Sequence, residues 1–374
     1  MILIKNICNN FFLSGEKLSR FSILIDDCGN VEKIGDIPEN DAYKCIDAEF
    51  CYVSPGWVDV HTHIYKGVCD IGIDPDLIGP KTGVSTLIDA GSSGCVTFTG
   101  LRDYIIKKKD YPIYEFLNYG VIGITRCNII CDYETDDFVE PDETLRCIED
   151  NRDIIRGLKL RACKVVFKGR GIPFVRDAEA LAREAKVPMM VHVGEPEPYL
   201  GDILDVLGSG DVVTHCFNGK PGNILDPHTG KIIIQALKAR DRGVLFDVGH
   251  GCASYDTNIG KAAIKQGFKP DMIGSDLHGH SYPNPVRNLP VTMSKMCSSG
   301  LSVEEILRAV TITAKNMLRI PLGIQVGEKA SFTLFKIIDK QVVYRDVYDN
   351  PIDTHVQFIP LYTIVGDTVF ACEG

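Results

Sequence analysis

Short apolar runs recur through the middle of this chain, and most of them close on a polar or charged residue. They predict eight buried strands, at residues 56–63, 84–89, 113–118, 157–162, 188–194, 211–215, 243–247 and 272–276. Helical patterns lie between them, including 177–186, 231–242 and 258–266, with Asp177 as the expected N-cap of the first. Strands that alternate with helices in this way predict a (β/α)8 TIM-like barrel. A doubly wound sheet is the competing architecture, but no glycine-rich fingerprint follows the first strand.

Both ends of the chain have the alternating pattern of strands. Short strand-like segments fill much of residues 1–53, and the pattern returns over 323–374, after the barrel region 54–322. We expect the two ends to pair into one small sheet domain beside the barrel. Ser302 and Glu305 have the spacing of a capping box, which predicts a helix that begins there.

Composition narrows the class of protein. The net charge of −10 argues against nucleic acid or an anionic membrane as a partner. The fourteen cysteines include no Cys-x-x-Cys pair, and no apolar run is as long as a bilayer span. We therefore expect a soluble, cytoplasmic protein.

The chemistry begins at the first strand of the barrel region, which a Pro-Gly turn precedes. Its alternation places His61 and His63 on the same side, as a ready pair of metal ligands. The alternative is two ordinary polar residues at a strand end. Other predicted strands carry further polar groups near their ends, namely Lys159, His192, His215 and Asp276. Because barrel active sites lie at the C-terminal ends of the strands, we expect all six side chains to lie together.

The residue types suit a metal site. Neutral imidazoles bind zinc and similar divalent ions, and a carboxylate beside metal-activated water can accept a proton. Lysine is unusual there, because its ammonium group would repel two cations. A carbamate formed from its amine and carbon dioxide would be an anion, although spacing alone cannot reveal that modification.

Several long segments resemble the amidohydrolase superfamily, in particular a deacetylase-type branch related to dihydroorotase. They are the Pro-Gly-Trp-Val-Asp-Val-His-Thr-His segment at 55–63, residues 83–94, 214–219, 246–251, Asp-Leu-His-Gly at 276–279, and 289–295. The resemblance implies a barrel with a β-sandwich built from both termini. It also implies two divalent metal ions, with zinc as the default.

The resemblance further implies a role for each of the six residues. His61 and His63 would hold one metal, His192 and His215 the other, and N6-carboxylysine at Lys159 would bridge them. Asp276 would bind the first metal and act as general base for a metal-bridging hydroxide. Lys159 follows the family's Gly-x-Lys pattern, whereas the competing Lys164 falls where a loop should begin.

Four residues are candidates for substrate contacts. Arg161 could hold a carboxylate or form a structural salt bridge, while Asn218, His250 and His278 follow strand ends and could line the pocket. His228, His280 and His355 are expected at the surface or in loops.

The leading function is hydrolysis of an amide or ester of a small, carboxylate-bearing substrate such as an acetylated acid, by a homo-oligomeric enzyme. A cyclic-amide hydrolase of the dihydroorotase or hydantoinase kind would use the same six residues. Its relatives carry an arginine two positions after the second histidine, where this chain has Tyr65. A one-metal deaminase would not need Lys159. A non-catalytic homologue would be expected to have lost ligands.

Overall fold

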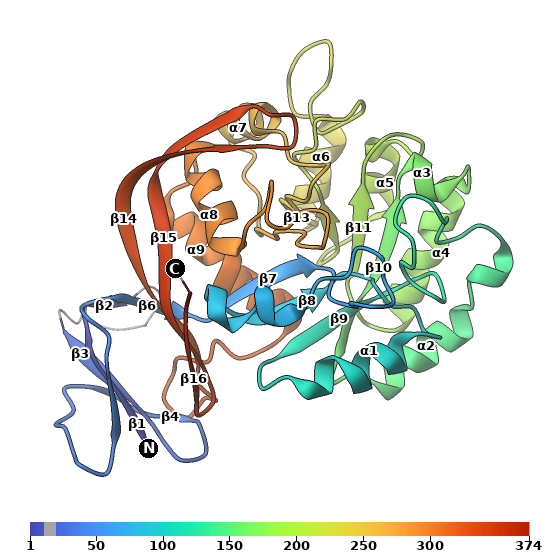
Figure 1. The fold of residues 1–374 in the computed structure, drawn as a ribbon. Coiled ribbons are helices and arrows are strands. Elements are labelled where there is room, and N and C mark those ends of the chain that lie inside the picture. Colours follow the sequence, from blue (N-terminus) through green and yellow to red (C-terminus); the bar gives the residue numbers. More distant parts are fainter. Residues whose placement is uncertain (11–19, 374) are drawn as a thin grey trace.

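The centre of the computed structural model, which describes residues 1–10 and 20–373, is a curved parallel sheet surrounded by helices (Figure 1). Residues 11–19, within the predicted N-terminal strand region, lie outside the described part. Seven strands follow one another across the sheet in sequence order: β7 (Trp57–Thr62), β8 (Val84–Asp89), β9 (Ile113–Asn118), β10 (Ile155–Ala162), β11 (Met189–Val193), β12 (Val212–Thr214) and β13 (Leu245–Asp247). Every residue of β7 and β8 is buried, because side chains or helices cover both faces of the sheet.

The eighth predicted strand, 272–276, is not a regular strand. Met272 makes one parallel bridge to Asp247 of β13, and Leu277 makes one to Thr62 of β7, so the segment lies between the last and first strands. Asp276 has a φ of 50°, a left-handed conformation that an extended ladder cannot accommodate. The prediction of eight regular strands is therefore wrong in this detail, and the sheet has seven.

Helices cover the outside of the sheet. They are α1 (Phe98–Tyr104), α2 (Pro141–Asp150), α3 (Lys164–Phe167), α4 (Gly171–Glu184), α5 (Leu200–Val206), α6 (Ile234–Asp241), α7 (Thr257–Lys265), α8 (Leu289–Ser298), α9 (Val303–Arg308) and α10 (Ala314–Leu318). The capping box of Ser302 and Glu305 at α9 is confirmed. Asp177 is not an N-cap, because α4 begins six residues earlier at Gly171. None of the described helices combines the length and apolar character that a bilayer span requires.

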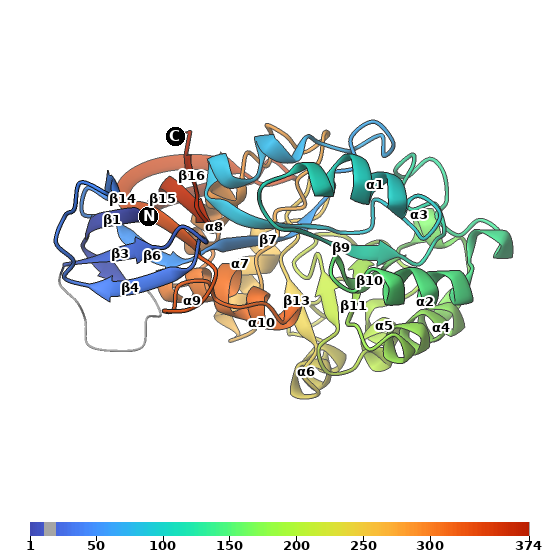
Figure 2. The same cartoon turned by 90° about the horizontal axis from the view of Figure 1, so that it is seen from below.

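The two ends of the chain form two further sheets (Figure 2), one from the N-terminal end alone and one from both ends. One contains β1 (Ile2–Ile7), β3 (Phe21–Ile25), β4 (Val31–Gly35) and β5 (Lys44–Asp47). The other contains β2 (Asn9–Asn10), β6 (Tyr52–Pro55), β14 (Ser331–Arg345), β15 (Pro351–Val365) and β16 (Thr368–Ala371). One apolar cluster joins them, with Ile4 and Ile23 from the first sheet and Phe332 and Ile364 from the second. The expected small sheet domain from both termini is therefore present, while its boundaries at 53 and 323 stay a prediction.

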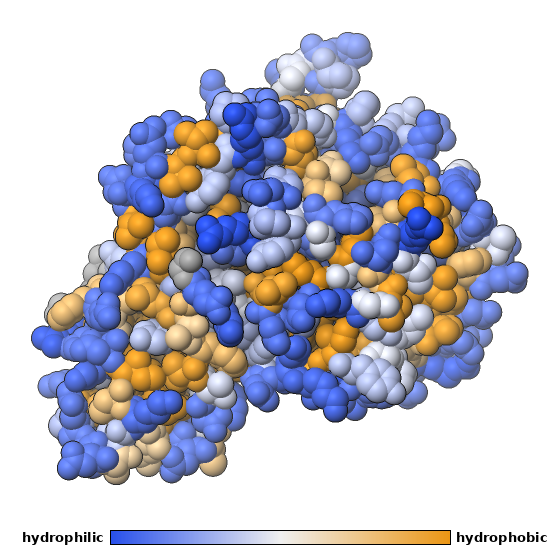
Figure 3. Space-filling view, viewed as in Figure 1, coloured by the Kyte–Doolittle hydropathy of each residue, from blue (hydrophilic) through white to orange (hydrophobic). Residues whose placement is uncertain are grey.

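The long hairpin of β14 and β15 extends from this sheet domain along the side of the barrel (Figure 1). β15 packs against α8, and the Asp346 carboxylate at the hairpin tip accepts a hydrogen bond from the backbone N–H of Thr257, the first residue of α7. The hairpin thus attaches the terminal domain to the rim of the barrel. Apolar side chains gather on the surface of the terminal sheets, at the lower left of Figure 3.

Candidate metal centre

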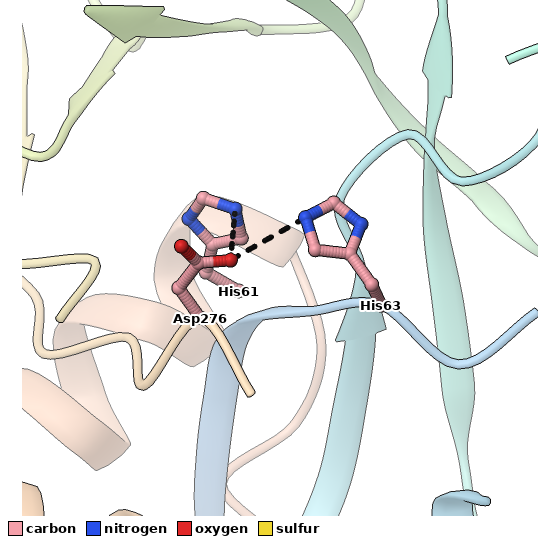
Figure 4. A group of neighbouring side chains, drawn as sticks. All are labelled: His61, His63 and Asp276. Carbon is pink, nitrogen blue, oxygen red and sulfur yellow. Dashed lines mark ion pairs between the residues drawn. The ribbon is translucent and has the colours of Figure 1, made fainter. Parts of the chain in front are cut away.

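Three side chains form a compact cluster where β7 ends. His61 and His63 present Nε2 to the carboxylate of Asp276, and each Nε2 lies 3.4 Å from Asp276 Oδ1 (Figure 4). All three residues are buried, and ligand atoms from each lie within 4.8 Å of one another. A single divalent ion could contact all three without a change of fold.

Hydrogen bonds on the far side of each ring orient these histidines. The Thr214 hydroxyl donates to Asp247 Oδ2 at 2.7 Å and lies 2.8 Å from His61 Nδ1, so it is placed to accept the Nδ1 proton. His63 Nδ1 lies 3.0 Å from the Ser92 hydroxyl. With Nδ1 engaged in this way, the lone pair of Nε2 faces the cluster, which is the arrangement that metal-binding histidines require.

His192 of β11 and His215 after β12 stand beside the first cluster. Their ring centroids are 4.4 Å apart, and the His215 ring lies 5.1 Å from that of His61. His215 Nδ1 donates to the carbonyl of Gly249 at 2.6 Å, whereas its buried Nε2 has no hydrogen-bond partner in the described chain. A buried polar atom without a partner costs about 1–3 kcal/mol, and a cation bound there would remove that penalty.

Lys159 extends from β10 into the same space. Its Nζ lies 3.2 Å from His61 Nε2 and 3.4 Å from Met190 Sδ, and the side chain is buried. Burial lowers the pKa of this amine to about 7, so a large fraction is neutral at physiological pH. Lys164, the competing lysine, is exposed at the first position of α3. The described residues of the cluster therefore fit cations: four imidazoles, a carboxylate and an amine that can lose its charge.

Asp276 is held ionised and in a strained conformation. Burial opposes its charge, but the neighbouring His61, His63, His278 and His215 outweigh this and keep the pKa of the carboxyl well below its ordinary value. His215, with φ 67°, shares with Asp276 a left-handed backbone, which is rare outside glycine. A Cβ on Gly251 would lie 2.3 Å from Asp276 Oδ2, so only glycine lets that loop pass behind the carboxylate.

A cavity of about 360 Å³ opens beside the cluster. His63, His192 and Asp276 form part of its wall, together with Arg161 and His278. The structure thus brings two of the four predicted substrate residues to the cavity. His280 is exposed, as expected, but it also lines the cavity, and no pattern along the chain separates it from ordinary loop histidines.

Arg161 was expected either to bind a substrate carboxylate or to form a structural salt bridge, and its position is compatible with both roles. It lines the cavity, but its guanidinium is buried and already paired, with Nη1 3.0 Å from Asp132 Oδ1 and Nη2 2.8 Å from Asn128 Oδ1. The structural salt bridge is therefore present.

Asn218 and His250 are not part of the cavity wall. The Asn218 amide donates to the His215 carbonyl at 2.9 Å and accepts from the backbone N–H of Lys220 at 3.1 Å. His250 is buried between the Gly251 carbonyl and Lys295 Nζ, both at 2.9 Å. Both residues support the loops that carry the site. Their expected role in binding substrate stays a prediction that this placement does not favour.

Several important residues were missed at the sequence level. Thr214, Ser92 and Asp247 orient the histidines, and Lys220 and Glu195 line the cavity. Asp247 closes an apolar strand just as Asp276 closes its segment, so the same reasoning could have identified it. The others have no comparable pattern along the chain.

The fold and this cluster define a TIM-barrel-like α/β protein with a candidate metal centre at the C-terminal ends of its strands. The chain belongs to the amidohydrolase family, whose model matches residues 52–369, and the predicted membership is confirmed. A deacetylase of Agrobacterium fabrum is 38% identical over 375 residues, which cover 100% of this chain and 92% of the relative.

Two solved structures extend the likeness to the whole fold. A structure described as a dihydroorotase has a TM-score of 0.93 and 36% identity, and the match covers 100% of this chain and 98% of the other. A structure described as an adenine deaminase has a TM-score of 0.91 and 29% identity, with 99% of each chain covered.

Proposed function

We propose that this protein is a metal-dependent hydrolase that cleaves an amide or ester bond of a small acylated substrate carrying a carboxylate. The supporting observation is the buried convergence of His61, His63 and His215 on Asp276, where His215 Nε2 lacks a partner within the described chain. The deacetylase relative makes an acetyl group the first acyl group to test.

Six residues would hold two divalent ions. His61, His63 and Asp276 would bind one, His192 and His215 the other, and a carboxylated Lys159 would lie between them. Zinc suits this imidazole-rich set of ligands. When bound, such ions act as Lewis acids that polarise a carbonyl and activate water at neutral pH.

Lys159 would be modified before the site is complete. Burial keeps part of this amine neutral near pH 7. The neutral nitrogen adds to the carbon of carbon dioxide, a C–N bond forms, and the nitrogen loses one proton to give a carbamate anion. The buried ammonium, which would repel cations, becomes a group that attracts them.

Asp276 would act as the general base. Its carboxylate is ionised and buried, so it can accept a proton from the attacking water. The same proton then passes to the leaving nitrogen of an amide or the leaving oxygen of an ester. The cavity beside His63 and His192 leaves room for a small substrate.

The first experiment is elemental analysis of protein purified without chelator, with the intact mass and a hydrolysis screen of N-acetyl and O-acetyl acids of both hands. We expect close to two divalent ions per chain and release of acetate from at least one substrate. About one ion would favour a mononuclear, deaminase-like centre. Metal-free protein that metal addition cannot activate would overturn the proposal.

A cyclic-amide hydrolase is the second candidate, because a structure described as a dihydroorotase is 36% identical to this chain. Against it, Ile64 and Tyr65 follow His63, both are buried, and neither can bind a carboxylate as an arginine would. Dihydroorotate and a hydantoin in the same screen separate the two functions. We also expect a cytoplasmic homo-oligomer. Size-exclusion chromatography with light scattering can measure its oligomeric state.

A further inference from the structure

One wall of the cavity carries a lysine that the proposed reaction does not use. Lys220 lies in the loop after β12, lines the cavity, and has a largely buried side chain. Its Nζ donates to Glu195 Oε2 at 3.1 Å, and within the described chain Glu195 is its one side-chain partner. An ammonium group has three N–H donors, so Lys220 keeps donors that can bind a ligand.

The position of Lys220 is tied to the candidate metal centre. Asn218 joins the carbonyl of His215 to the backbone N–H of Lys220 through its side-chain amide. The turn from a proposed metal ligand to this lysine is therefore closed by two hydrogen bonds. These bonds fix the backbone of Lys220, from which its side chain extends into the cavity, relative to His215.

Lys220 and His192 line the same cavity, on either side of Gly194. A Cβ at Gly194 would lie 3.8 Å from Lys220 Nζ, 3.7 Å from His192 Nε2 and 3.2 Å from Cys163 Cβ. The ammonium and the imidazole thus border the same small volume. An anionic group there would contact Lys220 while an adjoining carbonyl reached the side of His192.

The other cation of the wall has less capacity for an anion. Arg161 already directs its guanidinium at Asp132 and Asn128, and Asp132 neutralises its charge in a buried pair. Removing a buried guanidinium from such a pair is strongly unfavourable. Glu195, by comparison, is partly exposed and can turn away from Lys220.

We propose that Lys220 binds the substrate carboxylate in the cavity that it lines with His192, and that Glu195 competes with that carboxylate for the ammonium. This inference rests on the proposed function, because it assigns the acidic part of that substrate. It replaces Arg161 as the carboxylate ligand and makes Lys220 the residue that selects acids over neutral analogues.

The test compares Lys220→Met and Glu195→Gln with the wild-type holoenzyme. The probes are N-methanesulfonylalanine of both hands, whose sulfonamide resists hydrolysis, and the matching carboxamide, with binding measured by calorimetry. Lys336→Met is the control, because this lysine also pairs with a glutamate, Glu49 at 3.0 Å, but lies in the terminal sheet. Circular dichroism and metal content establish that each variant is intact.

We expect the wild type to bind the acid about 10- to 100-fold more tightly than the carboxamide, as one charge-assisted hydrogen bond allows. Lys220→Met should abolish that preference without changing carboxamide binding, and Lys336→Met should keep it. Glu195→Gln should strengthen acid binding, which provides a second test if Lys220→Met does not fold. No acid preference in the wild type, or a preference that survives Lys220→Met, would overturn the inference.

Hydrolysis of N-acetylalanine, measured in parallel, separates the two proposals. If binding is acid-selective and depends on Lys220 but no acyl substrate is hydrolysed, the role of Lys220 is supported and the proposed reaction is rejected. If the enzyme hydrolyses the acid and Lys220→Met does not raise the KM, the reaction is supported and the role of Lys220 is rejected.

Discussion

Thr214→Val tests whether hydrogen bonds behind the histidines maintain the metal centre. Valine has nearly the shape of threonine, so the change removes one hydroxyl and little volume. That hydroxyl connects Asp247 Oδ2 at 2.7 Å with His61 Nδ1 at 2.8 Å, and all three residues are buried. The substitution therefore leaves a carboxylate oxygen and a ring nitrogen without their partner.

The size of the effect follows from these contacts. A buried polar group that loses its partner costs about 1–3 kcal/mol, and loss of a second-sphere hydrogen bond typically weakens metal binding by about 10- to 100-fold. Burial raises the pKa of Asp247 to about 6, while the Thr214 hydroxyl opposes that rise. Without the hydroxyl the pKa should increase further, so Asp247 gains a proton near neutral pH and the orientation of His61 is lost.

Competition with a chelator measures metal affinity, and urea unfolding of the metal-free protein measures stability. We expect Thr214→Val to bind metal at least about 10-fold more weakly, and Thr214→Ser, which keeps the hydroxyl, to stay close to the wild type. If the valine variant binds metal within about twofold of the wild type, the hydroxyl does not maintain the orientation of His61, and our reasoning fails.

Three other substitutions test separate parts of the structure. Asp276→Asn should lower kcat by about 100- to 10,000-fold while the fold persists, and near-normal turnover would exclude Asp276 as the base. Lys159→Ala should lose metal, with activity partly restored by added short-chain carboxylates; unchanged metal content would exclude a bridging role. Lys315 is buried, which lowers its pKa to about 7, so the unfolded chain binds more protons between that pH and 10.5. Wild-type stability relative to Lys315→Met should therefore rise by about 1.4 kcal/mol per pH unit across that interval, as urea unfolding at pH 7, 8 and 9 can measure; a constant difference would contradict the pKa shift.

The strands were predictable because burial on both faces of the sheet requires a continuous run of apolar residues in the sequence. β8 and β9 have the predicted bounds, and β7 is one residue shorter than predicted at each end. The segment at 272–276 has the same apolar pattern but is not a strand, since Asp276 takes a left-handed backbone. A local pattern cannot reveal that conformation, because contacts with the loop at Gly251 and with His61 impose it.

Helix boundaries were less predictable than strands. α7 has the side chain of Asp256 as its N-cap and begins one residue before the predicted segment. α4 begins at Gly171 without a side-chain cap, so the strongest capping residue nearby, Asp177, misplaced its start. Capping contributes only about 1 kcal/mol, and packing of Phe174 and Val175 against the core evidently outweighs it.

The sequence alone determined the family, the alternation of strands and helices, and the identity of the six residues proposed to hold metal. The six residues could be recognised because the C-terminal ends of parallel strands meet at one edge, so polar groups towards the ends of neighbouring apolar segments converge. Only the tertiary structure decided which groups surround them. Thr214 reaches His61 across 153 positions, Arg161 is neutralised by Asp132, and Lys220 lines the same cavity as His192. These contacts join loops that no local periodicity relates, and they depend on how side chains fill the barrel mouth after the chain has folded.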